Sequence, residues 1–257
     1  MKVFSLTSIF IFVILFSSFS QGKNAANGSG SSKTLDNLSN TPLIVPKCED
    51  FELSGKGNNT EWNKAGWSEL TKLDTGGRNY AGRFKMMYSS TGIYVLFSGD
   101  DDKITTKDYN DNDAIFNGDV FEVFFHPDPS VPVYFEYEIN PLSKQLILTL
   151  SRLNNQQFSW YPRYRATDNQ KPVRRMVDVA GDSVKVGATI ESWTAEVFFP
   201  FALLGLLPGV PPKSGTTWNA NFCRLDYDSG KMIKYSYSPA IEKSFHELNK
   251  FLSIKFE

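Results

Sequence analysis

The stretch Phe116-Asn117-Gly118-Asp119-Val120-Phe121-Glu122-Val123-Phe124-Phe125-His126-Pro127 decides the fold. Asn117-Gly118 is a turn signal, and the residues after it are rich in the β-branched and aromatic side chains typical of a strand. Because strand side chains alternate, Phe121, Val123 and Phe125 share one apolar face, whereas Glu122 lies on the other. We therefore expect the first face to pack on a core and the second to be only partly buried.

A second strand is expected at residues 133–140. Its apolar face carries Phe135, Tyr137 and Ile139, and its opposite face carries Tyr134, Glu136, Glu138 and Asn140. The connection at 127–132 is short and rich in proline, which favours a hairpin between the two strands. The result is a sheet with one apolar face and one face of carboxylates and aromatic rings.

Short strand candidates recur along the chain between turn signals. They lie at residues 51–53, 81–88, 92–98, 120–126, 133–140, 145–150, 183–189, 193–199, 217–226, 234–238 and 251–256. No amphipathic helix of three turns is found, and residues 200–207 are expected to form one short helical turn. Residues 99–118 and 152–172 are expected to be long polar connections. This pattern predicts an all-β fold: one domain, a two-sheet antiparallel β-sandwich of the jelly-roll type.

The start of the chain has the features of a secretory signal. Residues 1–20 combine Lys2, a short apolar core at 9–16 and small residues at the end, although an uncleaved anchor is the alternative. Residues 21–45 are rich in Gly, Ser and Asn and predict a flexible tether, followed by the sandwich domain at 46–257. We expect a secreted protein, extracellular or periplasmic, with no membrane span after cleavage. A net charge of −1 over 257 residues gives no electrostatic reason to expect nucleic acid as a partner.

Export makes disulfide formation possible, and a separate feature of the sequence points to calcium. Cys48 and Cys223 allow a single intrachain disulfide, and two buried free thiols are the alternative. Carboxylates are dense between residues 100 and 119, so Asp101, Asp113 and Asp119 are candidate calcium ligands, with a solvated acidic loop as the alternative. The spacing does not match an EF-hand, because the required Gly and the distal Glu are missing.

Two other functions fit parts of the pattern. Glu122, Glu136 and Glu138 lie on adjacent strands, and two carboxyls that flank a bond are what glycoside hydrolysis requires. The enzymatic alternative is thus a glycoside-active protein, or the binding part of a hydrolase. A haem b electron-transfer sandwich, with Met86 or Met87 and His246 as ligands, is less favoured, because a strand methionine is more often core filling.

The order of parts resembles family 9 carbohydrate-binding modules, within the wider DOMON-like sandwiches, over residues 46–256. The similar elements are the opening at 51–62 with Trp62, the hairpin at 84–97, Gly118-Asp119-Val120-Phe121-Glu122, Trp193-Thr194-Ala195-Glu196 and Trp218-Asn219-Ala220-Asn221-Phe222-Cys223-Arg224, followed by the ending at 237–251. The resemblance implies a jelly-roll sandwich that binds calcium and is not an enzyme. It also implies a saccharide or polysaccharide ligand held between two aromatic side chains, and a glycoside hydrolase as a possible partner.

Positions carried over from the resemblance define a candidate sugar site. Phe116 and Phe245 would be its aromatic walls and Glu122 an acceptor of sugar hydroxyls. Glu138, Asn221, Arg224 and His246 complete the candidate set. The chain departs from the family at the walls, where Phe replaces Trp, and at Glu138, which stands where a basic contact is expected. The alternatives are that each Phe is a core or rim residue and that Arg224 pairs with Glu122 or Glu196.

Overall fold

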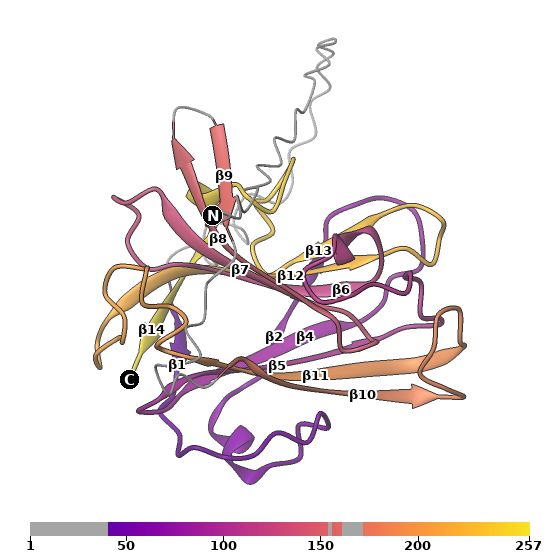
Figure 1. Ribbon diagram of the computed structural model, residues 1–257, viewed down its shortest axis with the longest axis horizontal. Coiled ribbons are helices and arrows are strands. Elements are labelled where there is room, and N and C mark those ends of the chain that lie inside the picture. The colour runs from indigo at the N-terminus through magenta and orange to yellow at the C-terminus, as the bar shows by residue number, and fades with distance from the viewer. Residues whose placement is uncertain (1–40, 154–155, 161–171) are drawn as a thin grey trace, which may run out of the picture.

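The computed structural model describes residues 41–153, 156–160 and 172–257. Two β-sheets pack face to face, one above the other in Figure 1. The helices among the described residues are the short 3-10 helices η1 (Thr60–Lys64), η2 (Ile115–Asn117) and η3 (Leu248–Lys250). None of the described helices has the length and apolar character needed to span a membrane. The all-β, one-domain sandwich predicted from the sequence is confirmed.

The larger sheet, called sheet A, holds the central stretch of the sequence. In spatial order it contains β1 (Leu43–Val45), β14 (Leu252–Phe256), β12 (Thr217–Asp226), β6 (Val120–His126), β7 (Val133–Ile139), β8 (Gln145–Leu153) and β9 (Gln156–Trp160); β13 (Ile233–Ser236) pairs with β12, and β3 (Thr71–Lys72) with β13. Sheet B contains β10 (Arg174–Gly181), β11 (Ile190–Pro200), β5 (Gly92–Asp100), β4 (Gly82–Tyr88) and β2 (Ser68–Glu69).

Strand β6 lies between β12 and β7 and is antiparallel to both. Its inward side chains join the main core between the sheets, where the Phe97 and Phe121 rings stack with centroids 4.8 Å apart and Phe125 packs edge-on against Phe199. The predicted bounds of β6 and β12 match the structure, because both strands combine strong β propensity with clear turn signals at their ends.

The outer face of sheet A is drier than the sequence predicted, since all seven residues of β6 are buried. A second apolar cluster covers this face. Its fully buried members include Ile115, Val120, Phe124, Tyr134, Leu146, Leu150, Phe245 and Phe251. They come from strands β6 to β8 and from the segments 101–119 and 237–251. Two connections that are far apart in the sequence therefore cover the outer face of sheet A.

Several local predictions were wrong. Residues 51–53 and 183–189 form no strand, and residues 201–207 form turns after the end of β11. Strand β9 lies in the predicted connection at 152–172, and β10 lies where no strand was predicted. Arg174, Arg175 and Asp178 interrupt the apolar pattern of β10, and such residues are tolerated because β10 is an edge strand with solvent on one side.

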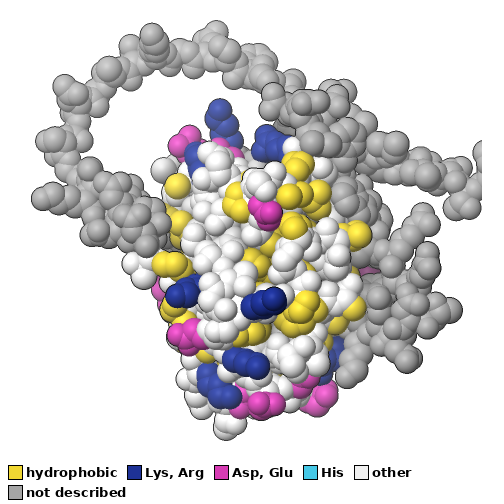
Figure 2. Space-filling view, turned by 90° about the vertical axis from the view of Figure 1, so that its left-hand side faces the viewer, with side chains coloured by type: hydrophobic (Ala, Val, Ile, Leu, Met, Phe, Trp, Pro, Cys, Tyr) yellow, Lys and Arg dark blue, Asp and Glu magenta, His cyan; other side chains and the backbone are white. Residues whose placement is uncertain are grey.

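The predicted signal peptide at 1–20 and most of the predicted tether at 21–45 lie outside the described residues. The last part of that tether is ordered, because Leu43–Val45 forms β1 and pairs in parallel with β14. The sandwich therefore includes residues 43–45, which the predicted boundary at residue 46 assigned to the tether. On the face seen in Figure 2, acidic and basic side chains are interspersed with hydrophobic ones.

Candidate functional site

Three glutamates form what we call the acidic floor on the outer face of sheet A: Glu122, Glu136 and Glu138. Glu122 is directly opposite Glu138 in the β6–β7 pair, and Glu136 is opposite Phe124. Their exposed fractions are only 3%, 4% and 2%. Strand alternation explains the grouping, because all three side chains share one face of adjacent strands.

Burial is the main reason why the acidic floor favours protonated carboxyls. It raises the pKa of Glu122 well above the ordinary value, and the nearby Glu136 carboxyl raises it further. Burial, followed by the Glu122 and Glu136 carboxyls, does the same for the pKa of Glu138, against the opposing backbone N–H of Phe116. Like charges in a buried site cannot all ionise, so the protonated forms of Glu122 and Glu138 are favoured, and a protonated carboxyl can donate a hydrogen bond.

The floor has unused hydrogen-bonding capacity. Oε2 of Glu136 and Oε2 of Glu138 have no hydrogen-bond partner among the described residues. The nearest cationic candidate is His246, whose Nδ1 lies 4.0 Å from Oε2 of Glu136 and 2.9 Å from the Tyr134 hydroxyl. A buried polar atom without a partner costs about 1–3 kcal/mol, so a polar ligand that reached this floor would recover that cost.

The predicted aromatic walls both lie over the floor. Phe245 is 7% exposed and packs against Phe124 with ring centroids 6.4 Å apart. Phe116 is half-buried at the edge of the same cluster, and its carbonyl accepts a hydrogen bond from the Tyr227 hydroxyl at 2.8 Å. The two rings are thus brought to one side of the molecule, but Phe245 is packed down, so a ligand reaches the floor only if Phe245 moves.

Phe245 and His246 belong to residues 237–251, between β13 and β14, which we call the roof segment. Among the described residues, two hydrogen bonds tie it to strands β7 and β8: the Tyr134–His246 contact, and a 2.9 Å bond that Arg152 Nη1 donates to the His246 carbonyl. The segment is braced internally by Lys250, which pairs with Glu242 at 3.0 Å and Glu247 at 3.3 Å. His246 is therefore its main polar attachment to the strands beneath.

Asn221 and Arg224, both predicted sugar contacts, occupy different places. Asn221 is on the outer face of β12, and its Oδ1 accepts hydrogen bonds from Ser236 Oγ and Ser238 N, both at 3.0 Å. It thereby anchors the start of the roof segment. Arg224 projects from the opposite face of β12 and is fully buried beside the Phe121 ring. The structure does not bring Arg224 to the acidic floor.

The alternative partners suggested for Arg224 are also wrong. Its Nη2 donates to Asp226 at 2.8 Å and to Asp101 at 3.1 Å, and its Nη1 donates to the Asp100 carbonyl at 2.6 Å. Glu196 is occupied elsewhere, since it accepts a 2.6 Å bond from Trp62 Nε1. Glu122 lies on the other face of the sheet.

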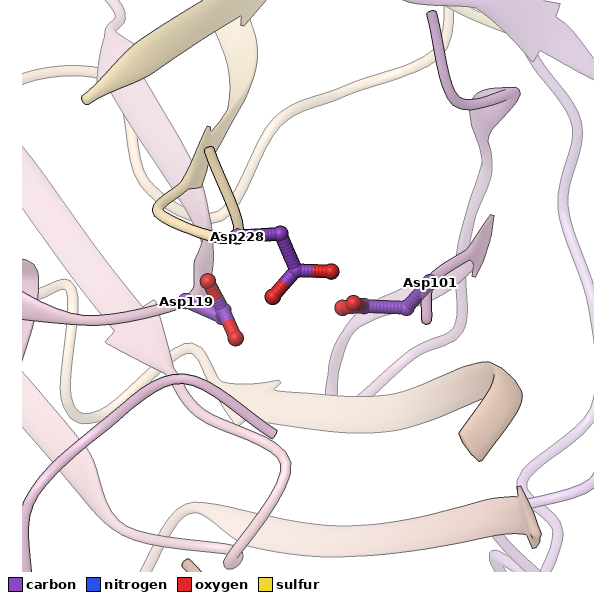
Figure 3. Close-up of side chains that lie close together, drawn as sticks. All are labelled: Asp101, Asp119 and Asp228. Atoms are coloured by element: carbon purple, nitrogen blue, oxygen red, sulfur yellow. The ribbon is translucent and has the colours of Figure 1, made fainter. Parts of the chain in front are cut away.

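The aspartate cluster, our name for Asp101, Asp119 and Asp228, is the second acidic site. One carboxylate oxygen from each lies within 4.8 Å of the others, and the three side chains converge in Figure 3. Burial raises the pKa of Asp101 to about 7 despite the Arg224 cation, and burial with the Asp101 charge raises that of Asp119 to about 8. Backbone N–H groups of Thr105 and Tyr227 donate to Asp119 and oppose its shift.

The donor set of the aspartate cluster fits a calcium ion. Calcium binds six to eight oxygen ligands, of which carboxylates are the most common. Arg224 pairs with Asp101 of the cluster and with Asp226, and Asp119 and Asp228 add two further carboxyls, so the acids outnumber the cations among the described residues of this region. A divalent ion held by the three cluster carboxylates would neutralise that excess.

The sequence predicted two of the three members. Asp113 is not part of the cluster; its carboxylate accepts a 2.7 Å bond from the Asn110 backbone within its own turn. Asp228 was missed, although its position in the turn Tyr227-Asp228-Ser229-Gly230 directly after β12 was a usable signal. No local sequence pattern shows that the ends of β5 and β12 meet at the start of β6, because this depends on how the strands are arranged in the sandwich.

The predicted disulfide is wrong. Cys48 and Cys223 are both free and buried. Cys223 belongs to the cluster on the outer face of sheet A, whereas Cys48 belongs to a third cluster, with Trp62 and Tyr94, on the outer face of sheet B. The thickness of the sandwich separates the two thiols.

The haem alternative is wrong as well. Met86 lies in the core between the sheets, and Met87 packs with Cys48 on the outer face of sheet B. His246 is on the outer face of sheet A, bonded to Tyr134. No methionine of β4 can therefore share a haem iron with His246.

A hollow of about 450 Å³ lies beside the start of β10, away from both acidic sites. It is lined by Glu52, Leu53, Ser143, Val173, Arg174, Arg175 and Met176. Both arginines are already engaged, Arg174 with Glu52 at 3.2 Å and Arg175 with Asp111 at 2.8 Å. The sequence did not predict this feature, since it had not placed a strand there.

Comparison with known proteins supports the predicted family. The family model for carbohydrate family 9 binding domain-like proteins matches residues 53–157. No curated protein matches the chain. Among solved structures, a candidate carbohydrate-binding protein from Bacteroides uniformis ATCC 8492 has a TM-score of 0.65 at 16% identity, with 84% of this chain and 99% of that chain covered.

Two further similar structures are family 9 carbohydrate-binding modules from Caldicellulosiruptor kristjanssonii. The complex with glucose has a TM-score of 0.56 at 12% identity and covers 83% of this chain and 95% of that one. The complex with cellotriose has a TM-score of 0.55 at 13% identity and covers 84% and 94%. The family model therefore matches residues 53–157 of this chain, and the solved structures show that the chain shares the β-sandwich fold of these carbohydrate-binding proteins.

Proposed function

We propose that the chain is a non-catalytic carbohydrate-binding domain of a secreted protein, and that it binds a saccharide on the acidic floor. The observation that carries this proposal is the pair of buried carboxyl oxygens, on Glu136 and Glu138, that have no partner among the described residues. Sugar hydroxyls both donate and accept hydrogen bonds, so they complement neutral carboxyls, which do the same. The glucose and cellotriose complexes of structurally similar proteins favour this ligand class.

Access to the floor requires movement of the roof segment. Phe245 covers Phe124, and His246 holds the segment to β7 and β8 through Tyr134 and Arg152. In the bound state, Phe245 and Phe116 would lie against the apolar face of a sugar ring while Glu122 and Glu138 hold its hydroxyls. Sites of this type combine apolar walls with a few well-placed polar groups.

A glycan array followed by calorimetric titration with cellotriose tests this proposal. Phe245→Ala and Glu122→Leu should each weaken binding about tenfold or more, because one removes a wall and the other removes a buried hydrogen-bonding group. Trp67→Ala is the matched control: Trp67 is an exposed aromatic on the other sheet, and its loss should leave affinity unchanged. Retention of no glycan by the wild type, or unchanged affinity in both floor variants, would refute the proposal.

We also propose that the aspartate cluster holds calcium. Its support is the convergence of three carboxylates in a region that already contains one cation and still has excess negative charge. Calcium at a hundred times its dissociation constant should stabilise the fold by about 2.7 kcal/mol. Asp228→Asn should abolish this effect, whereas Asp113→Asn, outside the cluster, should retain it; a melting temperature insensitive to calcium would contradict the site.

A further inference from the structure

Strand β10 differs from the other long strands of the sandwich. It is the edge strand of sheet B and pairs only with β11. Of the strands with at least four residues whose burial is described in full, β10 alone contains no buried residue. The opposite edge of sheet B ends in β2, which is only two residues long. Sheet B therefore has one long edge with which no other strand of the described residues pairs.

The backbone of this edge has free hydrogen-bonding groups. In an antiparallel pair, alternate residues of an edge strand point their N–H and C=O groups away from the neighbouring strand. No backbone hydrogen bond outside the β10–β11 pair is made by residues 174–181 among the described residues. Such an edge is a template for another extended chain, and proteins usually protect it.

The side chains of β10 are complementary to themselves. Its outer face carries Arg174, Met176 and Asp178 in alternation, and Met176 is 46% exposed. We propose that β10 pairs antiparallel with β10 of a second copy of this chain, about a two-fold axis at Met176. Arg174 then lies opposite Asp178 of the second copy, twice by symmetry, and the two Met176 side chains meet at the centre.

Other registers are less favourable. A two-fold axis perpendicular to the sheet leaves outward-facing side chains facing outward. Directly opposite residues of the two strands must face the same side, so the axis has to pass through a residue and not between two residues. An axis at Arg175 places arginine opposite arginine, and an axis at Asp178 places aspartate opposite aspartate, which is destabilising in cross-strand pairs. An axis at Val177 forms no charge pair. Of these registers, only the one with the axis at Met176 places both Arg174 and Asp178 opposite a residue of the opposite charge.

The two charged side chains differ in what they already contact. The Asp178 side chain makes no hydrogen bond or ion pair in the described part of the chain. Arg174 pairs with the exposed Glu52 and also donates to the Phe51 carbonyl at 3.3 Å and to the Tyr94 hydroxyl at 3.1 Å, so pairing with Asp178 of a second copy exchanges these contacts for a new ion pair. Val177 and Val179 face inward against the main core and hold the strand in place. The predicted interface is small, so we expect a reversible dimer.

Cysteine cross-linking tests the position of the axis. Residues directly opposite in an antiparallel pair have Cα atoms about 4.5–5.5 Å apart, within the range that a disulfide spans. Met176→Cys should therefore form a covalent dimer under mild oxidation. Val184→Cys is the control: it is exposed but lies beyond the strand, so it should cross-link far less. The natural thiols are buried and should not react.

Charge reversal tests the register independently. Asp178→Arg and Arg174→Asp should each weaken self-association about tenfold or more in sedimentation equilibrium, since two attractive pairs become repulsive. An equimolar mixture of the two variants should recover the dimer, because every pair is again of opposite sign. Circular dichroism checks that both remain folded. A monomeric wild type, equal cross-linking of both cysteine variants, or no recovery on mixing would each overturn the proposal.

Discussion

The acidic floor and the aspartate cluster are both made of buried carboxyls, but they differ in what surrounds them. The aspartate cluster is rich in donors: Asp101 accepts from Arg224 and from Trp193 Nε1, and Asp119 accepts from two backbone N–H groups. In the described part of the chain the acidic floor pairs with no Lys or Arg, and two of its oxygens have no hydrogen-bond partner.

This difference indicates two kinds of site. Donors and a guanidinium favour the ionised form, so the pKa of Asp101 rises only to about 7 in spite of deep burial. The acidic floor lacks such compensation, so burial favours the protonated forms of Glu122 and Glu138, which suit a neutral, hydroxyl-rich ligand. Burial alone therefore does not decide what an acidic group can bind; its donors do.

Removal of the cation should have the largest effect on stability. Arg224→Met leaves Asp101 and Asp226 buried without their partner, and breaking a buried pair in this way costs roughly 3–5 kcal/mol. Urea unfolding of the metal-free protein measures the change. Arg78→Met is the control, because Arg78 pairs with Asp102 at an exposed site and its loss should cost far less. Equal costs would remove the distinction between the two carboxyl sites.

Amide substitutions at the two acidic sites should differ in their effect on the free energy of unfolding. Asp119→Asn replaces an acceptor by a donor that faces a backbone N–H, which should cost about 1–3 kcal/mol. Glu138→Gln resembles the neutral acid already present, so it should cost less than about 1 kcal/mol at pH 7. Both values come from urea unfolding at pH 7. A larger loss for Glu138→Gln than for Asp119→Asn would reverse the assignment.

The pH dependence of stability should reveal the aspartate cluster, because calcium binding should change it. Asp101 and Asp119 have folded pKa values of about 7 and 8 against 3.8 in the unfolded chain, so the folded state binds more protons between those limits. The metal-free protein should lose stability as pH rises from 5 to 8, by up to about 1.4 kcal/mol per pH unit for each group. Excess calcium, or Asp101→Asn, should flatten this slope, as followed by unfolding at fixed pH values. A slope unaffected by either would contradict the proposed calcium site.

The sequence predicted the interior of the sandwich well and its margins poorly. Strands β6 and β12 have strong turn signals and strong β propensity, so their bounds were correct. Strand β10 carries three charges among eight residues, and its strand character depends on pairing with β11, which no local pattern reveals.

The acidic floor was partly predictable. Alternation along β7 places Glu136 on the same face as Glu138, although only Glu138 was assigned to the site. That Phe245 roofs this face followed from the family resemblance, but its close packing on Phe124 depends on the path of the roof segment. The separation of Arg224 from Glu122 was also predictable in principle, because β12 alternation puts Arg224 and Asn221 on opposite faces.

The most direct test is the titration of the glutamate carboxyls by ¹³C NMR, with signals assigned from Glu122→Gln and Glu138→Gln. We expect the Glu122 and Glu138 carboxyls to remain protonated at pH 7, and both signals to shift when cellotriose is added. Carboxyls that titrate near the ordinary glutamate pKa of about 4.3, and that do not respond to the sugar, would contradict a neutral floor built for a saccharide.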